Sequence, residues 1–107
     1  MNDPEISVQE LQRRLAAGEP LQLLDVREPW ECAIARLPTS VNIPLNEVPA
    51  RLQELDAGTD IIVMCHSGGR SGRAAAYLRS HGFDRVANLS GGIAAWTREI
   101  DPAVPSY

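Results

Sequence analysis

The sequence contains the stretch Asp60-Ile61-Ile62-Val63-Met64-Cys65-His66-Ser67-Gly68-Gly69-Arg70-Ser71, in which a thiol follows an apolar run. The apolar run, residues 61–64, has the continuous hydrophobicity of a central parallel strand. The Ala-rich segment that follows predicts a helix from Ser71 to His81, with Gly82 just past its end. Cys65 therefore lies on a strand-to-helix turn, where backbone N–H groups and the helix dipole favour an anion.

This position predicts a reactive cysteine. Converging N–H groups stabilise a thiolate, so we expect the pKa of Cys65 to be lowered. A loop wrapped around its own side chain needs positive φ angles and close backbone approach, which Gly68 and Gly69 supply at low cost. The alternative is a buried structural thiol, because free cysteines are among the most buried residues. The loop context favours the anionic nucleophile.

Helix and strand signals alternate along all 107 residues, without a repeat or a linker. The pattern predicts helices over about residues 8–17, 29–35 and 71–81, another on the face of Val48, Leu52 and Leu55, and a last one around Ala95 and Trp96. It predicts strands at 21–26, 41–43, 61–64 and 86–89. We expect one domain, residues 1–107, with an α/β fold: a small, mostly parallel central sheet with helices on both faces.

Composition narrows the classes of function. The net charge is −4 and acidic residues are interspersed with basic ones, so nothing favours nucleic acid as a partner. The sequence has neither a membrane-length apolar run nor the features of a signal peptide, and we expect no membrane contact and a cytoplasmic location. Two cysteines in unequal contexts do not form a disulfide framework, which suits a reducing compartment.

Four stretches carry a resemblance to a known family: Leu24-Asp25-Val26-Arg27-Glu28; Leu37-Pro38 with Val41-Asn42-Ile43-Pro44; the Cys65–Ser71 loop; and Gly91-Gly92-Ile93-Ala94-Ala95-Trp96. In this order and spacing, the chain resembles a single-domain rhodanese of the sulfurtransferase family. The resemblance implies a rhodanese-like fold, a thiosulfate sulfurtransferase activity, and no metal or organic cofactor.

The implied reaction uses Cys65 as the catalytic nucleophile. Its thiolate takes the sulfane sulfur of thiosulfate or of a persulfide donor, and the resulting persulfide passes that sulfur to cyanide, a thiol or a sulfur-carrier protein. The implied substrate-binding loop consists of His66, Ser67, Gly68, Gly69, Arg70 and Ser71, and the implied supporting residues are Asp25, Arg27, Glu28 and Arg73.

Individual roles within this site stay open. Arg70 either binds the anionic donor or braces the loop by pairing with an acid, for which Asp25 and Glu28 are candidates. His66 stands where many relatives carry Lys or Arg; we expect it to face solvent, with Arg73 compensating for the missing charge.

Two further residues follow Pro29: Trp30 on a predicted surface turn near the strand ends, and Cys32 in the predicted short helix. Trp30 either packs locally or lines the approach of the acceptor, and the sequence does not decide between these. We expect Cys32 to pack in the core rather than to act as a resolving thiol.

Two other functions compete with sulfur transfer. Tyrosine phosphatases use a Cys-x5-Arg loop, whereas Arg70 follows Cys65 after four residues, and the tighter ring suits a terminal sulfur better than a phosphate or arsenate. A non-catalytic rhodanese-like binding module is the other alternative, which the intact Cys65 loop disfavours. The tail, residues 99–107, is similar to that of rhodanese domains fused to adenylating enzymes, so a sulfur-carrier or adenylating-enzyme partner is a further hypothesis.

Overall fold

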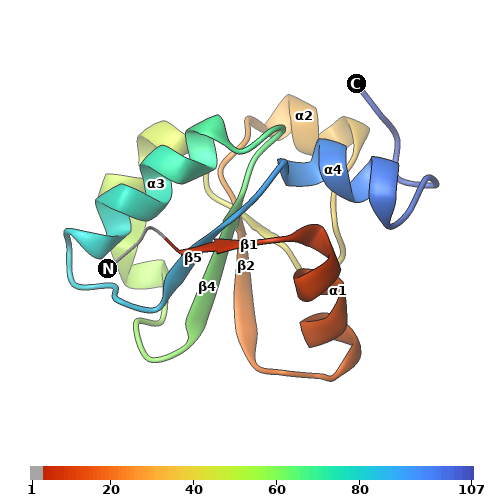
Figure 1. The fold of residues 1–107 in the computed structure, drawn as a ribbon. Coiled ribbons are helices and arrows are strands. Elements are labelled where there is room, and N and C mark those ends of the chain that lie inside the picture. Colours follow the sequence, from red (N-terminus) through yellow and green to blue (C-terminus); the bar gives the residue numbers. More distant parts are fainter. Residues whose placement is uncertain (1–3) are drawn as a thin grey trace.

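The computed structural model describes residues 4–107 and has a parallel sheet at its centre (Figure 1). In the described chain the strand order is β1-β5-β4-β2-β3, and every pair of neighbours is parallel. This confirms the predicted α/β class. The strands are β1 (Glu5–Ile6), β2 (Leu21–Asp25), β3 (Val41–Asn42), β4 (Asp60–Met64) and β5 (Val86–Leu89).

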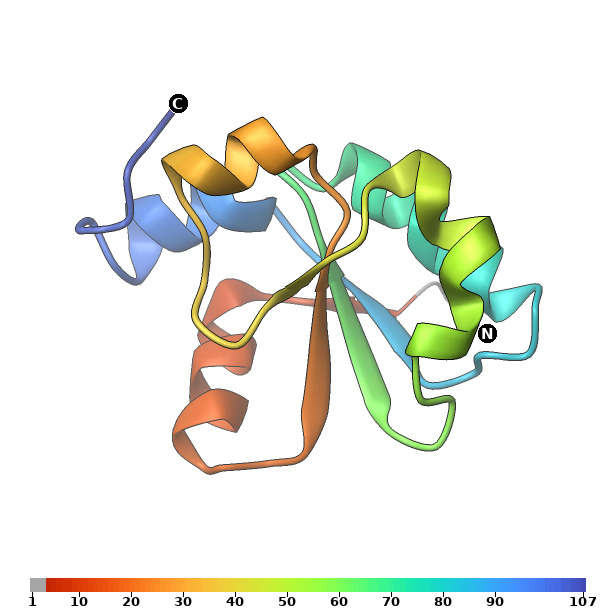
Figure 2. The ribbon, with the colours of Figure 1, turned by 180° about the vertical axis from the view of Figure 1, so that it is seen from behind.

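Helices cover both faces of the sheet (Figures 1 and 2). One core cluster unites the sheet with α1 and α4, and the other unites it with α3 and the 3-10 helix η1. None of the helices within residues 4–107 combines the length and the apolar character needed to span a bilayer. The helices are α1 (Val8–Ala16), α2 (Pro29–Ile34), η1 (Leu45–Glu54), α3 (Gly69–Arg79) and α4 (Gly92–Glu99).

The alternation along β4 explains where the thiol lies. Ile62 and Met64 pack in the α1 and α4 cluster, whereas Ile61 and Val63 pack in the α3 and η1 cluster. Successive side chains of a strand point to opposite faces, and Cys65 continues this period onto the α3 side. The end of the central strand thus delivers the sulfur to the start of α3.

Three elements differ from the sequence-based expectations. The helix predicted around residues 48–55 is the 3-10 helix η1, which starts at Leu45, contains Pro49 and has a kink at Arg51. The ring of a proline inside a helix clashes with the carbonyl group four residues earlier and its nitrogen has no proton to donate, so regular α-helical winding is interrupted here. The two-residue strand β1 was not predicted, and α3 begins at Gly69 rather than Ser71 because Gly68 turns the chain with φ 111°.

The N-terminus of α4 supports the turn after β4. The N–H groups of Ile93 and Ala94 donate to the carbonyl oxygens of Cys65 and His66, both at 3.0 Å. Gly92 makes this approach possible, because its φ is +59° and a Cβ there would lie 2.4 Å from the Cys65 carbonyl oxygen. Both the conformation and the close approach require glycine.

We predict that Gly92→Ala destabilises the fold far more than Gly18→Ala. Gly18 also has a positive φ, +70°, but a Cβ there would meet nothing within 4 Å, so it isolates the cost of the backbone conformation. We expect losses in the free energy of unfolding of about 3 kcal/mol or more for Gly92→Ala and about 1 kcal/mol for Gly18→Ala. Urea unfolding of both variants measures the difference, and equal losses would contradict the inferred collision.

Candidate active site

The Cys65 sulfur lies inside the turn that it begins. Cys65 is only 1% exposed, in the α3-side core cluster. The Gly68 amide donates to Sγ at 3.0 Å, and the Ser71 hydroxyl lies 3.3 Å from the same atom. Gly68 is the N-cap of α3, so the sulfur occupies the positive end of that helix. The predicted cradle is therefore present, with the thiol at its base.

These donors set the protonation of the thiol. Burial by itself would raise the pKa of Cys65, because it disfavours the charged form. Hydrogen bonds from the Ser71 hydroxyl and from the amides of Ser71, Gly68 and Ser67 outweigh burial, and the net pKa is lowered. The direction agrees with the sequence-based prediction and favours the thiolate as nucleophile.

A polar chain that the sequence analysis missed fixes the Ser71 hydroxyl. Ser71 Oγ lies 2.5 Å from Asn88 Oδ1 on β5, while Asn88 Nδ2 donates to the Glu5 carboxylate at 3.1 Å and to the Gly68 carbonyl at 3.2 Å. The Asn88 amide is thereby oriented. A serine hydroxyl has one proton, so Asn88 and the sulfur compete for it. Asn88 is the polar residue of the otherwise apolar strand β5, and this break in the pattern is the signal that would have indicated it.

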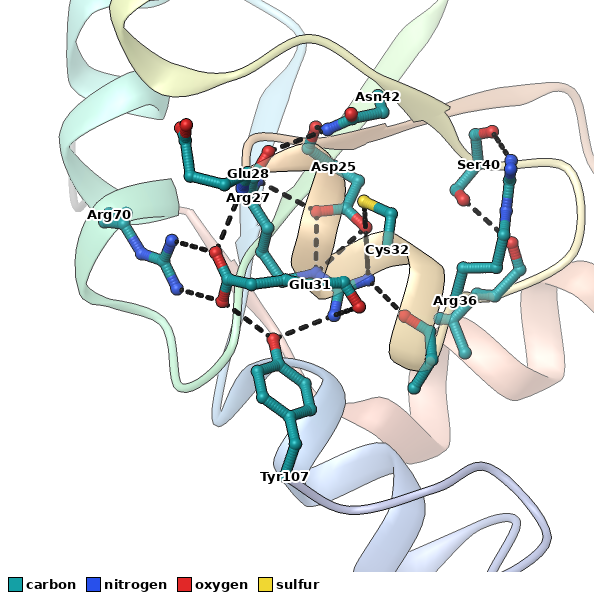
Figure 3. Close-up of polar contacts among 12 residues, drawn as sticks. Asp25, Arg27, Glu28, Glu31, Cys32, Arg36, Ser40, Asn42, Arg70 and Tyr107 are labelled. Carbon is teal, nitrogen blue, oxygen red and sulfur yellow. Dashed lines mark hydrogen bonds and ion pairs between the residues drawn. The ribbon is translucent and has the colours of Figure 1, made fainter.

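Arg70 pairs with Glu31 of α2, and not with Asp25 or Glu28 as expected. Its Nη1 and Nη2 atoms contact the two carboxylate oxygens at 2.6 and 2.9 Å (Figure 3). Asp25 is engaged by Arg27, and Glu28 is exposed at the N-cap of α2. The paired charge of Arg70, together with a backbone hydrogen bond, lowers the pKa of the buried Glu31 to about 2. The geometry is that of a loop brace.

Asp25 and Arg27 form a second ion pair beside the first. Both side chains are fully buried, and Arg27 Nη2 contacts Asp25 Oδ2 at 2.7 Å and the Ala35 carbonyl at 2.7 Å. Cys32 joins this cluster, with Sγ 3.5 Å from Asp25 Oδ2. Burial and the Asp25 charge raise the pKa of Cys32. Cys32 is therefore a half-buried, protonated thiol.

Tyr107, which the sequence analysis did not single out, connects the two ion pairs (Figure 3). Its hydroxyl donates to Glu31 Oε2 at 2.9 Å and accepts from Arg27 Nη1 at 2.8 Å. Its backbone oxygen lies 3.1 Å from Nε2 of His66. The centroids of the His66 and Tyr107 rings are 4.6 Å apart. His66 is therefore half-buried under the tail rather than turned to solvent as expected. The tail packs against the domain. Its contacts join residues far apart in the sequence, so no local sequence pattern indicates them.

The remaining predicted residues lie outside this network or at its margin. Arg73 is exposed and lines a separate depression beside η1. Glu28 closes the capping box of α2, in which its N–H donates to Glu31 Oε1 at 2.9 Å. Trp30 is 61% exposed and meets the Tyr107 ring edge-on at 6.2 Å. Ser67 and Gly69 are exposed at the top of the loop.

The structure is a parallel α/β domain in which the cysteine after the central strand is held by backbone amides. This combination of fold and site defines the class of protein. The rhodanese-like domain model matches residues 7–99, and the chain belongs to this family. A sulfurtransferase of Allochromatium vinosum is 41% identical over 94% of each chain. The relatives support a role in sulfur transfer.

Two further comparisons extend this result. The crystal structure of a rhodanese-related protein from Thermoplasma volcanium superposes with a TM-score of 0.83 at 30% identity, over 91% of this chain and 93% of the other. An adenylyltransferase and sulfurtransferase of Zea mays is 37% identical, with 95% of this chain matching 23% of that protein. The same domain thus occurs both alone and within a longer protein.

We predict that Ser71→Ala raises the pKa of Cys65, because the thiolate loses a hydrogen bond that favours it. The Ser71 hydroxyl is the largest of the hydrogen-bond contributions that lower this pKa, so the titration should move to higher pH. Thiolate absorbance in the ultraviolet, followed against pH in a Cys32→Ser background, reports the titration. Ser67→Ala is the matched control, because its exposed side chain is lost while its amide stays. An unshifted titration in Ser71→Ala would show that the amides suffice.

We predict that Glu31→Gln removes part of the acid sensitivity of the fold. Because the pKa of Glu31 is lowered from 4.5 to about 2, its ionised form stabilises the fold above about pH 4.5, and this contribution is lost as the pH falls towards 2. The contribution is on the order of 3 kcal/mol. Urea unfolding at about pH 6 and about pH 2 should show a smaller drop for Glu31→Gln than for the wild type. Glu54→Gln removes a carboxylate whose pair with Arg51 is exposed and screened by water, so this variant should retain more of the drop than Glu31→Gln.

Proposed function

We propose that the protein is a sulfurtransferase that carries sulfur as a persulfide on Cys65. The observation that carries this proposal is the 3.0 Å hydrogen bond from the Gly68 amide to Sγ at the N-terminus of α3. A sulfur atom held there is stabilised as an anion before the reaction begins, which is electrostatic preorganisation. The same donors can stabilise the terminal sulfur of a persulfide.

The reaction has two steps that balance in atoms and charge. With thiosulfate as donor, the Cys65 thiolate attacks the sulfane sulfur, the S–S bond of the donor breaks, and sulfite leaves with the electron pair. A persulfide anion remains on Cys65. With cyanide as acceptor, carbon bonds to the outer sulfur, the S–S bond of the persulfide breaks, and thiocyanate leaves as the thiolate of Cys65 returns. Neither step needs a metal or a redox partner.

The burial of Cys65 is compatible with this reaction. The side chain is 1% exposed, yet a disulfide-type S–S bond extends about 2 Å beyond Sγ and carries the transferred atom towards the open side of the loop. The exposure of Ser67 and Gly69 leaves that side accessible. The loop is short, with Arg70 after four residues and its guanidinium drawn to Glu31, so it offers a bound phosphate few contacts. These features favour sulfur over phosphate chemistry.

The physiological acceptor is proposed to be a thiol or a sulfur-carrier protein, reached in the cytoplasm. The support is the Zea mays relative, whose name joins adenylyltransferase and sulfurtransferase activities, and a tail that contacts the candidate site through Tyr107. A carrier activated by adenylation ends in an acyl group that a persulfide sulfur can attack. Thiosulfate and a small organic persulfide are the proposed donors.

We predict a gain of roughly 32 Da, one sulfur atom, when the protein is incubated with thiosulfate. Intact-mass and peptide mass spectrometry should place it on Cys65, with none on Cys65→Ser and an unchanged gain on Cys32→Ser. Cyanide should then remove it and release thiocyanate.

Two results would contradict the proposed function. Failure of both thiosulfate and an organic persulfide to modify Cys65 would favour a non-catalytic binding module. Robust Cys65-dependent hydrolysis of an aryl phosphate would favour a phosphatase.

A further inference from the structure

A depression of about 580 Å³ lies beside the Cys65 loop, between α4 and the tail. His66, which directly follows the nucleophile, forms part of its wall. The volume falls within the range of about 300 to 1,000 Å³ that is typical of small-molecule sites. A small inorganic anion such as thiosulfate needs only the amide loop and would leave this space unfilled. Its lining comprises His66, Ile93, Ala94, Thr97, Arg98, Pro102, Pro105, Ser106 and Tyr107.

The outer wall of the depression is fixed in place. Tyr107 is tied through its hydroxyl to Glu31 and Arg27, and through its backbone oxygen to His66. Pro102 and Pro105 stiffen the segment that leads to it. Between these two prolines, Val104 packs against the core cluster of α1 and α4. The wall is therefore a built part of the domain, which matters because a preformed pocket binds at lower entropic cost.

The chemistry of the lining selects for an anion with an organic body. Arg98 is the one permanently charged side chain of the described lining, and no acidic residue of residues 4–107 contributes to it. The Arg98 guanidinium contacts the exposed Glu99 carboxylate at 2.8 Å, and a ligand carboxylate would compete with this exposed pair. The proline rings, Ile93 and the tyrosine ring supply apolar surface. The Thr97 hydroxyl is buried and makes no hydrogen bond within the described residues, a costly arrangement that a polar ligand group could relieve.

From these observations we infer that the depression binds the organic part of the sulfur donor, a low-molecular-weight persulfide that carries a carboxylate. The inference rests on the proposed function of Cys65. The carboxylate pairs with Arg98, and the persulfide end reaches the loop past His66. The Cys65 thiolate attacks the outer sulfur of R–S–SH, the donor S–S bond breaks, RS⁻ leaves with the electron pair, and Cys65–S–SH forms. The released thiol occupies the same pocket as product.

The kinetic test compares two donors with cyanide as the common acceptor. We expect Arg98→Glu to raise KM for glutathione persulfide roughly tenfold and to leave kcat and KM for thiosulfate within about twofold. Arg13→Glu is the matched control: Arg13 also lies in the last turn of a helix, is exposed, and pairs with a neighbouring glutamate, so it changes net charge equally. Arg13→Glu should not change KM or kcat for one donor more than for the other. Equal effects of Arg98→Glu on both donors, or none, would overturn the inference.

A binding measurement separates this inference from the proposed function. Reduced glutathione, which carries no transferable sulfur, should shift the NMR signals of residues 93–98 and 105–107 in the wild type and much less in Arg98→Glu. If reduced glutathione binds but no donor forms a persulfide on Cys65, the proposed function is refuted and the inferred binding site in the depression is retained. If both donors transfer sulfur, glutathione does not bind, and Arg98→Glu leaves KM for glutathione persulfide unchanged, the inferred binding site is refuted and the proposed function is retained.

Discussion

The candidate site depends on the hydrogen bonds of the turn that follows β4. Carbonyl groups of this turn bond to α4, and an amide of this turn bonds to the Cys65 sulfur. The carbonyl oxygens of Cys65 and His66 accept hydrogen bonds from the first turn of α4, while the amide of Gly68 faces the sulfur. A helix N-terminus has N–H groups without partners inside the helix, and α4 uses them to hold the turn from behind. The start of α3 provides the donors in front. Two helix N-termini thus define one loop, and Gly92 is the residue that lets them approach.

A second constraint comes from charge. The Tyr107 hydroxyl joins two ion pairs, Asp25 with Arg27 and Glu31 with Arg70. Taking charges out of water costs more than a single pair returns unless the remaining hydrogen-bonding groups are satisfied. Here the Ala35 carbonyl and the tyrosine hydroxyl satisfy them. Such a network fixes geometry, and the geometry it fixes is the position of Arg70 relative to the loop.

The sequence predicts what is local and misses what tertiary contacts create. The strand, the cysteine and the loop glycines are contiguous, so their spacing was sufficient to predict the cradle and the parallel fold. Glu31 lies 39 residues before Arg70, and Tyr107 lies 80 residues after Arg27, so no periodicity links them. Asp25 and Glu28 were reasonable partners for Arg70 by motif, but the Arg27 pair already occupies Asp25. The segment η1 was predicted as helical, but it starts earlier, at Leu45, is wound as a 3-10 helix and has a kink at Arg51.

Under the proposed function, the deep burial of Cys65 has a chemical consequence. A persulfide offers two sulfur atoms to a nucleophile, and attack on the inner one would join the acceptor to the enzyme and release hydrosulfide. In this fold the inner sulfur is covered by the α3-side core, with Cys65 1% exposed, and only an atom about 2 Å further out projects towards the open side of the loop. Burial therefore directs attack to the outer sulfur. The lowered pKa of Cys65 acts in the same direction, because a stabilised thiolate is the better leaving group.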